Sequence, residues 1–366
     1  MNETLAELTQ SLFATLGMQG VTNSLGISET GSKRECLLLV DGLGKNAIEE
    51  FGATTEFIRQ LVLDRTLEAT FPSTTATSLT SLGTGLCAGE HGMVGYTMRV
   101  PNSGTPERVL NALKWDERVD PYIWQPNPTL FERANAAGLS TTHIAGKRYA
   151  DSGFTRASLR GAKYLGANNI EELSDGARDS LIKNPSFAYV YLNDVDDASH
   201  NAGYGSEKFL VALRKVDQLV GRLMEKLPRG SRLWVVSDHG MINRSGYVVV
   251  GKENSLLDEV DLMAGEPRVR YLYMKRDSLE RVRSRWLEFL GDQVEILRRD
   301  EAISRGLFGP TVSESVSERI GDLVVIANGE FILVEREREA QQLAMVGHHG
   351  GITKPEVEIP LLRYEI

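Results

Sequence analysis

The stretch Leu233-Trp234-Val235-Val236-Ser237-Asp238-His239-Gly240 decides the fold prediction for this chain. Its first four residues form a short apolar run, which is typical of a buried strand in a parallel sheet. A carboxylate and an imidazole follow at once, and both are side chains that bind divalent metals. We therefore predict a buried strand over 233–236 with metal-ligating residues at its carboxyl end.

Two other apolar runs lead into the same residue types. Residues 37–40 precede an aspartate and a glycine, residues 187–192 run into an acidic segment with a histidine, and a histidine pair stands near the C-terminus. Carboxylates and imidazoles at several strand ends predict one assembled metal centre. The candidates are Asp41, Asp194, Asp196, Asp197, His200, Asp238, His239, His348 and His349.

Strand-like runs alternate with helical patterns along most of the chain. The clearest helix covers 207–226, where apolar residues recur at helical spacing, and an amphipathic helix is expected over 3–17. Such alternation predicts an α/β fold with a doubly wound, mostly parallel sheet covered by helices on both faces. In that architecture, functional side chains lie at the carboxyl ends of the strands.

The pattern changes after about residue 254. We predict a strand over 269–274, a helix over 279–290, and strands over 294–297, 323–327 and 331–334, with Asn328-Gly329-Glu330 as the hairpin turn between the last two. The expected organisation is a catalytic core of residues 1–254 and 341–366 with a small inserted α+β cap subdomain of residues 255–340. Residues 95–130 are expected to form a long ordered loop over the site.

Composition narrows the partners. The chain has 366 residues, 41% hydrophobic and 25% charged, which is ordinary for a soluble globular protein. The net charge of −9 argues against a polymeric nucleic acid as partner. No apolar run is long enough to cross a membrane, there is no signal-peptide pattern, and two cysteines give no disulfide framework, so we expect a cytoplasmic protein. The sequence does not decide the oligomeric state.

The candidate ligands are all nitrogen or oxygen donors, which is typical of catalytic rather than structural sites. Three carboxylates and three imidazoles are too many for one ion and suit two divalent metals that share an anionic substrate. Zinc is the first choice for mixed His/Asp ligation, and manganese or iron would also fit. A nucleophile could come from the hydroxyl-rich segment 71–78, although on this segment alone an ordinary helix N-cap is the favoured interpretation.

The ordered series of motifs resembles the alkaline phosphatase superfamily, and most closely its nucleotide pyrophosphatase/phosphodiesterase (type I phosphodiesterase) branch. The resemblance covers residues 36 to 351. The motifs that carry it are Asp41-Gly42, Phe71-Pro72-Ser73-Thr74-Thr75, Gly83-Thr84-Gly85, Glu90-His91-Gly92-Met93, Asp196-x-x-x-His200, Ser237-Asp238-His239-Gly240 and His349-Gly350.

The resemblance implies a role for each residue. Asp41, Asp238 and His239 would hold one metal, with Thr75 as the nucleophile that touches it, and Asp196, His200 and His349 would hold the second; His91 would be structural. The implied activity is two-metal hydrolysis of phosphate esters through a phospho-threonine intermediate, with phosphodiester or nucleotide pyrophosphate bonds in small, nucleotide-like substrates.

Two positions depart from the branch. Val195 stands where many members have proline, and residues 92–97 lack the asparagine that usually holds a phosphoryl oxygen. Tyr96 or Thr97 could take the place of that asparagine, and Tyr96 and Lys147 are the candidate substrate contacts. Alternative functions are a phosphonoacetate hydrolase-like C–P bond hydrolase, a phosphomonoesterase, and a catalytically inactive, metal-stabilised binding protein. Because every ligand and nucleophile position is filled, an enzyme is favoured.

Overall fold

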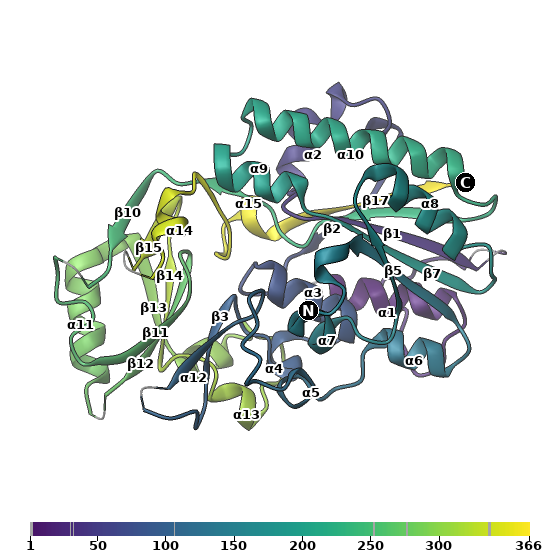
Figure 1. Ribbon diagram of the computed structural model, residues 1–366. Coiled ribbons are helices and arrows are strands. Elements are labelled where there is room, and N and C mark those ends of the chain that lie inside the picture. Colours follow the sequence, from purple (N-terminus) through teal and green to yellow (C-terminus); the bar gives the residue numbers. More distant parts are fainter. Residues whose placement is uncertain are drawn as a thin grey trace.

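The computed structural model describes residues 3–29, 31, 33–105, 107–251, 253–275, 277–335 and 338–366. Its centre is a seven-stranded sheet in the order β2-β17-β8-β1-β7-β5-β6 (Figure 1). Only β17 runs antiparallel to its neighbours among these strands, so the predicted mostly parallel sheet is confirmed. The strands are β1 (Arg34–Val40), β2 (Val62–Glu68), β5 (Ser140–Gly146), β6 (Lys163–Ala167), β7 (Ser186–Leu192), β8 (Arg232–Val236) and β17 (Glu358–Glu365).

Helices cover both faces of this sheet, as predicted (Figure 1). Alternate residues of β1 enter two separate cores: Leu37 and Leu39 pack on one face, and Leu38 and Val40 on the other. The period of two follows from the pleat of a strand that is buried on both sides. The first face holds α1 (Leu5–Thr15), α3 (Thr75–Thr84), α6 (Leu130–Ala136) and α7 (Gly153–Ser158); the second holds α2 (Lys45–Phe51), α8 (Ile170–Ser180), α9 (Asp194–Ala202) and α10 (Glu207–Lys226).

A second, antiparallel sheet lies beside the first, in the order β11-β12-β14-β13. Helix α11 (Leu279–Leu290) packs on one of its faces through Val282, Trp286 and Leu290. The opposite face, which includes Tyr271 and Val324, belongs to the same hydrophobic core as β1. The strands are β11 (Val260–Glu266), β12 (Val269–Met274), β13 (Val294–Arg298) and β14 (Leu323–Ala327).

Two expectations about this half of the molecule are wrong. The turn at 328–330 does not close a hairpin: β15 (Phe331–Val334) leaves β14 and pairs in parallel with β10 (Gly246–Val249), because Ser245 N–H bonds Glu330 O and directs the chain to another sheet. Residues 95–130 are not one long loop, since β3 (Thr97–Val100) and β4 (Arg108–Asn111) pair as an antiparallel hairpin that buries Met98 and Leu110.

Short elements complete the fold. These are α4 (Ala88–His91), α5 (Pro121–Trp124), α12 (Arg299–Ser304), α13 (Glu314–Ser317), α14 (Ala340–Ala344), α15 (Lys354–Val357), β9 (Ile242–Asn243), β16 (Gly347–His348) and 3₁₀ turns at Gly52–Thr54, Ile58–Gln60, Lys147–Tyr149 and Gly291–Gln293. Within the described ranges, none of the helices combines the length and apolar composition that crossing a bilayer demands.

Candidate metal centre

Three neighbouring strands of the central sheet, β8, β1 and β7, deliver the carboxylates to one edge. Asp41 follows β1 directly, Asp238 lies two residues after β8, and Asp196 lies in the first turn of α9 just after β7. The strands are parallel and in register, with Leu39 opposite Val236 and Tyr191, so their carboxyl ends coincide. The chain path at this edge is tight: a Cβ on Gly42, whose φ is +74°, would lie 3.0 Å from Asp196.

The first ligand group consists of Asp41, Asp238 and His239, all three fully or almost fully buried. His239 Nε2 lies 3.3 Å from Asp41 Oδ1 and 3.4 Å from Asp238 Oδ2. Backbone N–H groups of Gly42 and His239 both donate to Asp238 Oδ1, whereas Asp238 Oδ2 is buried and accepts no hydrogen bond from any residue that the structure describes. One carboxylate oxygen is thus fixed by the backbone and the other faces the centre.

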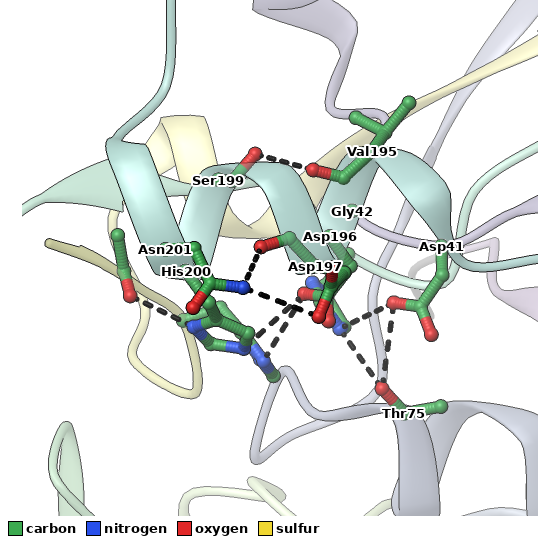
Figure 2. A network of polar contacts seen from close by, with 12 residues as sticks. Asp41, Gly42, Thr75, Val195, Asp196, Asp197, Ser199, His200 and Asn201 are labelled. Atoms are coloured by element: carbon green, nitrogen blue, oxygen red, sulfur yellow. Dashed lines mark hydrogen bonds and ion pairs between the residues drawn. The ribbon is translucent and has the colours of Figure 1, made fainter. Parts of the chain in front are cut away.

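The second group consists of Asp196, His200 and His349. His200 Nε2 lies 3.3 Å and His349 Nε2 3.7 Å from Asp196 Oδ1, which is also buried and has no hydrogen-bond donor among the described residues. Asp196 and His200 project from the same side of α9 toward Asp41 and Thr75 (Figure 2). The two groups adjoin, because the rings of His239 and His349 stack at 3.6 Å between centroids and 9° between planes.

Backbone carbonyls orient all three imidazoles. The Nδ1–H of His200 donates to Gly347 O at 2.8 Å, that of His239 to Gly240 O at 2.9 Å, and that of His349 to Ser73 O at 2.9 Å. A carbonyl can only accept, so Nδ1 carries the proton and Nε2 presents a lone pair. Metal-ligating histidines are commonly held in this way.

Without bound cations, burying these ionisable side chains together costs free energy. Burial, then Asp238 and Asp196, raises the pKa of Asp41 well above its ordinary value, and burial is also the main reason that the pKa of Asp196 is raised. Burial, then His239 and His200, lowers the pKa of His349 well below its ordinary value. Buried carboxylates that repel each other, two orphaned oxygens and three imidazoles whose Nε2 atoms face the cluster are a donor set that fits divalent metal ions.

The hydroxyl of Thr75, in the segment 71–78, contacts side chains of the first ligand group. Thr75 begins α3, and its Oγ1 is 3.2 Å from His239 Nε2 and 3.5 Å from Asp41 Oδ1. The Tyr191 hydroxyl donates to the other oxygen of Asp41 at 2.5 Å. Thr77 is buried, and its hydroxyl has no hydrogen-bond partner within the described chain.

The last ligand segment and the nucleophile segment are joined through Ser73. Its N–H donates to Gly350 O at 3.2 Å, its Oγ donates to Gly351 O at 2.7 Å, and the Gly350 N–H donates to Ser73 Oγ at 3.2 Å. His349 therefore points into the cluster, whereas the neighbouring His348 Nε2 faces Met345 O at 3.3 Å. His91 is bonded in the core instead, between Ser81 and Met93.

Two cavities meet at Thr75. The larger, of about 360 Å³, contains Asp41 and is lined by Tyr149 and Tyr191 among other apolar side chains. The smaller, of about 210 Å³, contains Asp196, His200, His349, Tyr96 and Glu266. Lys147 lines neither of these two and borders a separate hollow, while Arg148 beside it lines the larger cavity.

Glu266 lines the smaller cavity and is not among the site residues predicted from the sequence. The signal was present, because Glu266 ends the apolar strand β11 just as Asp41 follows β1. A single glutamate with no histidine nearby in the sequence did not stand out as a ligand candidate.

The fold and this arrangement of candidate ligands define a member of the alkaline phosphatase superfamily. The family model "Type I phosphodiesterase / nucleotide pyrophosphatase" matches residues 36–352. The chain belongs to that family. The recognition made from the motifs is thereby confirmed.

Individual relatives agree with this placement. The chain is 26% identical over 258 residues to mouse ectonucleotide pyrophosphatase/phosphodiesterase family member 1, which covers 65% of this chain and 27% of that protein. It is 26% identical over 223 residues to the human protein of the same name, covering 56% of this chain and 23% of that protein. The chain therefore spans about a quarter of the length of the curated relatives it matches.

Solved structures share the fold. Murine ectonucleotide pyrophosphatase/phosphodiesterase 5, as an inactive threonine-to-alanine variant in complex with AMP, superimposes with a TM-score of 0.70 at 16% identity, covering 91% of this chain and 88% of that one. Phosphonoacetate hydrolase from Sinorhizobium meliloti 1021, in complex with phosphonoformate, reaches 0.67 at 16% identity, covering 91% and 90%.

Proposed function

We propose that this protein is a two-metal hydrolase of phosphodiester or nucleotide pyrophosphate bonds that uses Thr75 as a covalent nucleophile. The observation that carries the proposal is the position of Thr75 Oγ1, within 3.5 Å of both Asp41 and His239 in a cluster with two orphaned carboxylate oxygens. A nucleophile within reach of a strongly charged, buried ligand set is the arrangement that activation of a hydroxyl requires.

Asp41, Asp238 and His239 would hold one divalent ion, and Asp196, His200 and His349 the other, with zinc proposed because the donors mix imidazole and carboxylate. Divalent ions at these positions supply Lewis-acid charge that lowers the pKa of a neighbouring hydroxyl and neutralises a departing oxygen. The donors needed are in place, since Nε2 of each histidine faces the cluster.

The chain's own residues account for the bond changes. Thr75 Oγ1 attacks phosphorus, the bond from phosphorus to the leaving oxygen breaks, the Thr75 proton passes through solvent to that oxygen, and phospho-Thr75 forms. Water then attacks the same phosphorus, the bond to Thr75 Oγ1 breaks, and one proton of the water passes to Thr75 Oγ1. Thr75 is the first residue of α3, so free N–H groups of the first helical turn are available to the phosphoryl oxygens.

Nucleotide-like substrates are proposed on three grounds. The larger cavity beside Thr75 presents Tyr149 and Tyr191, which suit a planar or apolar leaving group. The murine structural neighbour was solved with AMP, in a form made inactive by replacing a threonine with alanine. The relatives named above carry pyrophosphatase/phosphodiesterase names.

The test is a substrate panel for zinc-loaded protein: a bis-aryl phosphodiester, a nucleotide pyrophosphate, an aryl phosphomonoester, phosphonoacetate and an aryl sulfate. We expect kcat/KM for one of the first two to exceed every other class by at least about tenfold, the ratio that corresponds to about 1.4 kcal/mol. Preference for phosphonoacetate or for the monoester would replace the proposal by the corresponding alternative. No turnover of any class by correctly folded, metal-loaded protein would favour the inactive binding protein.

A further inference from the structure

Glu266 is a buried carboxyl group on the second sheet that reaches the candidate metal centre of the first. It is the last residue of β11, only 5% of it is exposed, and it lines the smaller cavity together with Thr75, Asp196 and His349. A phosphoryl group attached to Thr75 or approaching it would share that cavity with Glu266.

The two carboxyl oxygens of Glu266 have different surroundings. Oε2 accepts a hydrogen bond from the Tyr96 N–H at 2.9 Å, and Oε1 is buried with no hydrogen-bond partner within the described chain. The side chain also packs closely on the segment that bears His349: a Cβ on Gly350, whose φ is +122°, would lie 2.7 Å from Glu266 Cγ. Orientation is therefore fixed by contacts on two sides, and an orphaned oxygen in such a place costs free energy unless a ligand engages it.

We propose that Glu266 is a substrate-binding residue whose Oε1–H donates a hydrogen bond to a non-bridging oxygen of the phosphoryl group held at Thr75. The inference rests on the proposed function, because it takes a phosphate ester as the occupant of the smaller cavity. It adds a contact from the second sheet to chemistry that is otherwise supplied by the first.

The charge state of Glu266 supports a donor. Burial raises the pKa of Glu266 to about 8, although the Tyr96 N–H and Arg270 act in the opposite direction. Glu356 and Glu339 add to the rise, and Tyr271 on β12 also lies within electrostatic range. The ionisable residues that share its cavity are Tyr96, Asp196, His200, His348 and His349. Because Oε2 is the acceptor for Tyr96, the proton of the neutral acid belongs on Oε1.

The alternative role for Glu266 is to anchor the segment around Tyr96, and the chain offers a matched control for it. Thr97 Oγ1 donates to Gly265 O at 2.7 Å, which ties the same segment to the same strand without reaching Oε1. Thr97→Val removes this link alone. An anchoring role predicts that loss of either link has the same effect, whereas a donor role predicts that only Glu266 matters.

The experiment measures the dissociation constant of inorganic phosphate for zinc-loaded protein by calorimetry, without turnover. Glu266→Gln should bind within about threefold of wild type, since its amide oxygen can accept from Tyr96 and its NH₂ can donate to phosphate. Glu266→Met and Glu266→Asp, which remove or withdraw the donor, should weaken binding at least about tenfold, as expected for a hydrogen bond to a charged group. Thr97→Val should match wild type, and metal content should be equal in all variants.

Three results would overturn the inference: Gln as weak as Met, which would require a carboxylate acceptor; Met and Asp as tight as wild type; or Thr97→Val as weak as Met. The use of two weakening variants keeps the test valid if one of them fails to fold. Phosphate binding that depends on Glu266 in a protein that hydrolyses no ester would contradict the proposed function and leave this inference standing. Ester hydrolysis by a protein whose phosphate binding does not depend on Glu266 would leave the proposed function standing and contradict this inference.

Discussion

The carboxyl ends of β1 and β11 both present an acidic side chain to the cavities around Thr75, and the two side chains differ in their company. Asp41 faces Asp238 and Asp196, so three acids crowd together and their repulsion favours bound cations. Glu266 is absent from the candidate ligand groups and meets a single N–H donor. Clustered acids suit metal ligation, whereas an isolated buried acid suits a hydrogen bond from its neutral form. The surroundings therefore decide the role more than the residue type does.

The largest expected effect is that of removing the Thr75 hydroxyl, which lies beside Asp41 in the candidate metal centre. Thr75→Ala should lower kcat/KM by at least about 10³-fold, since removing a nucleophile removes its reaction path. The fold and the second metal should be retained, because Thr75 is not among the ligands of that metal. Steady-state kinetics with elemental analysis measures both. An active Thr75→Ala enzyme, or phosphate trapped on Thr74 or Thr77, would contradict the assignment.

The next largest effect separates the two adjacent histidines. His349→Ala should weaken binding of the second metal by about 10- to 100-fold, a loss typical of disturbing a metal site, and His348→Ala should leave it nearly unchanged. The reason is geometric: His349 Nε2 faces Asp196, whereas His348 Nε2 faces Met345 O. Metal titration monitored by calorimetry compares them. The opposite order would place the register one residue away.

Removing the metals should destabilise the candidate metal centre around Asp41 by an amount that depends on pH. The pKa values of Asp41 and Asp196 are raised in the folded, metal-free protein, so their contribution to stability is lost as the pH rises from the ordinary carboxyl value of 3.8 toward the raised values. The difference in Tm between zinc-loaded and chelated protein should therefore widen from pH 5 to pH 8. Thermal scans at both pH values measure it, and a constant or shrinking difference would contradict the repulsion argument.

The smallest effect concerns the leaving group. Tyr149→Ala should raise KM for an aromatic leaving group several-fold and change KM for a methyl ester less, because Tyr149 lines the larger cavity and has no part in the ligand groups. Metal content should be unaffected. A parallel loss of metal would mean that this segment helps to build the centre. The broader proposal is that residues 95–150 and the cap of 255–340 set substrate preference.

Apolar runs were sufficient to predict β1, β7 and β8, because these strands are buried on both faces. The same reasoning failed where neighbours in space decide the outcome. The chain after Asn328-Gly329 turns as predicted, but its next strand finds β10 rather than β14. Strand β17 was not predicted, since Pro360 argues against a strand interior; it is tolerated where β17 pairs with β2, before the pairing with β8 begins at Leu361.

The residues of the candidate site also divide into those that the sequence predicts and those that are positioned by tertiary packing. Asp41, Asp196, His200, Asp238, His239 and His349 gather as expected, because adjacent parallel strands bring their carboxyl ends together. Lys147 lines neither cavity at Thr75. The position of Glu266 at the end of a strand is visible in the sequence, but its place beside Thr75 follows from the packing of the second sheet against the first, which no local pattern encodes.

Two distant parts of the chain are joined into one mechanical unit by hydrogen bonds. Ser73 bonds with Gly350 and Gly351, and His349 donates to Ser73 O. Any hinge between the two sheets must pass outside this unit, because bending through it would break several bonds at once. Glu266 belongs to the other side of such a hinge. Movement of the second sheet would then change the contact between Glu266 and the phosphoryl group, while the distance from Thr75 to its ligand partners stays constant.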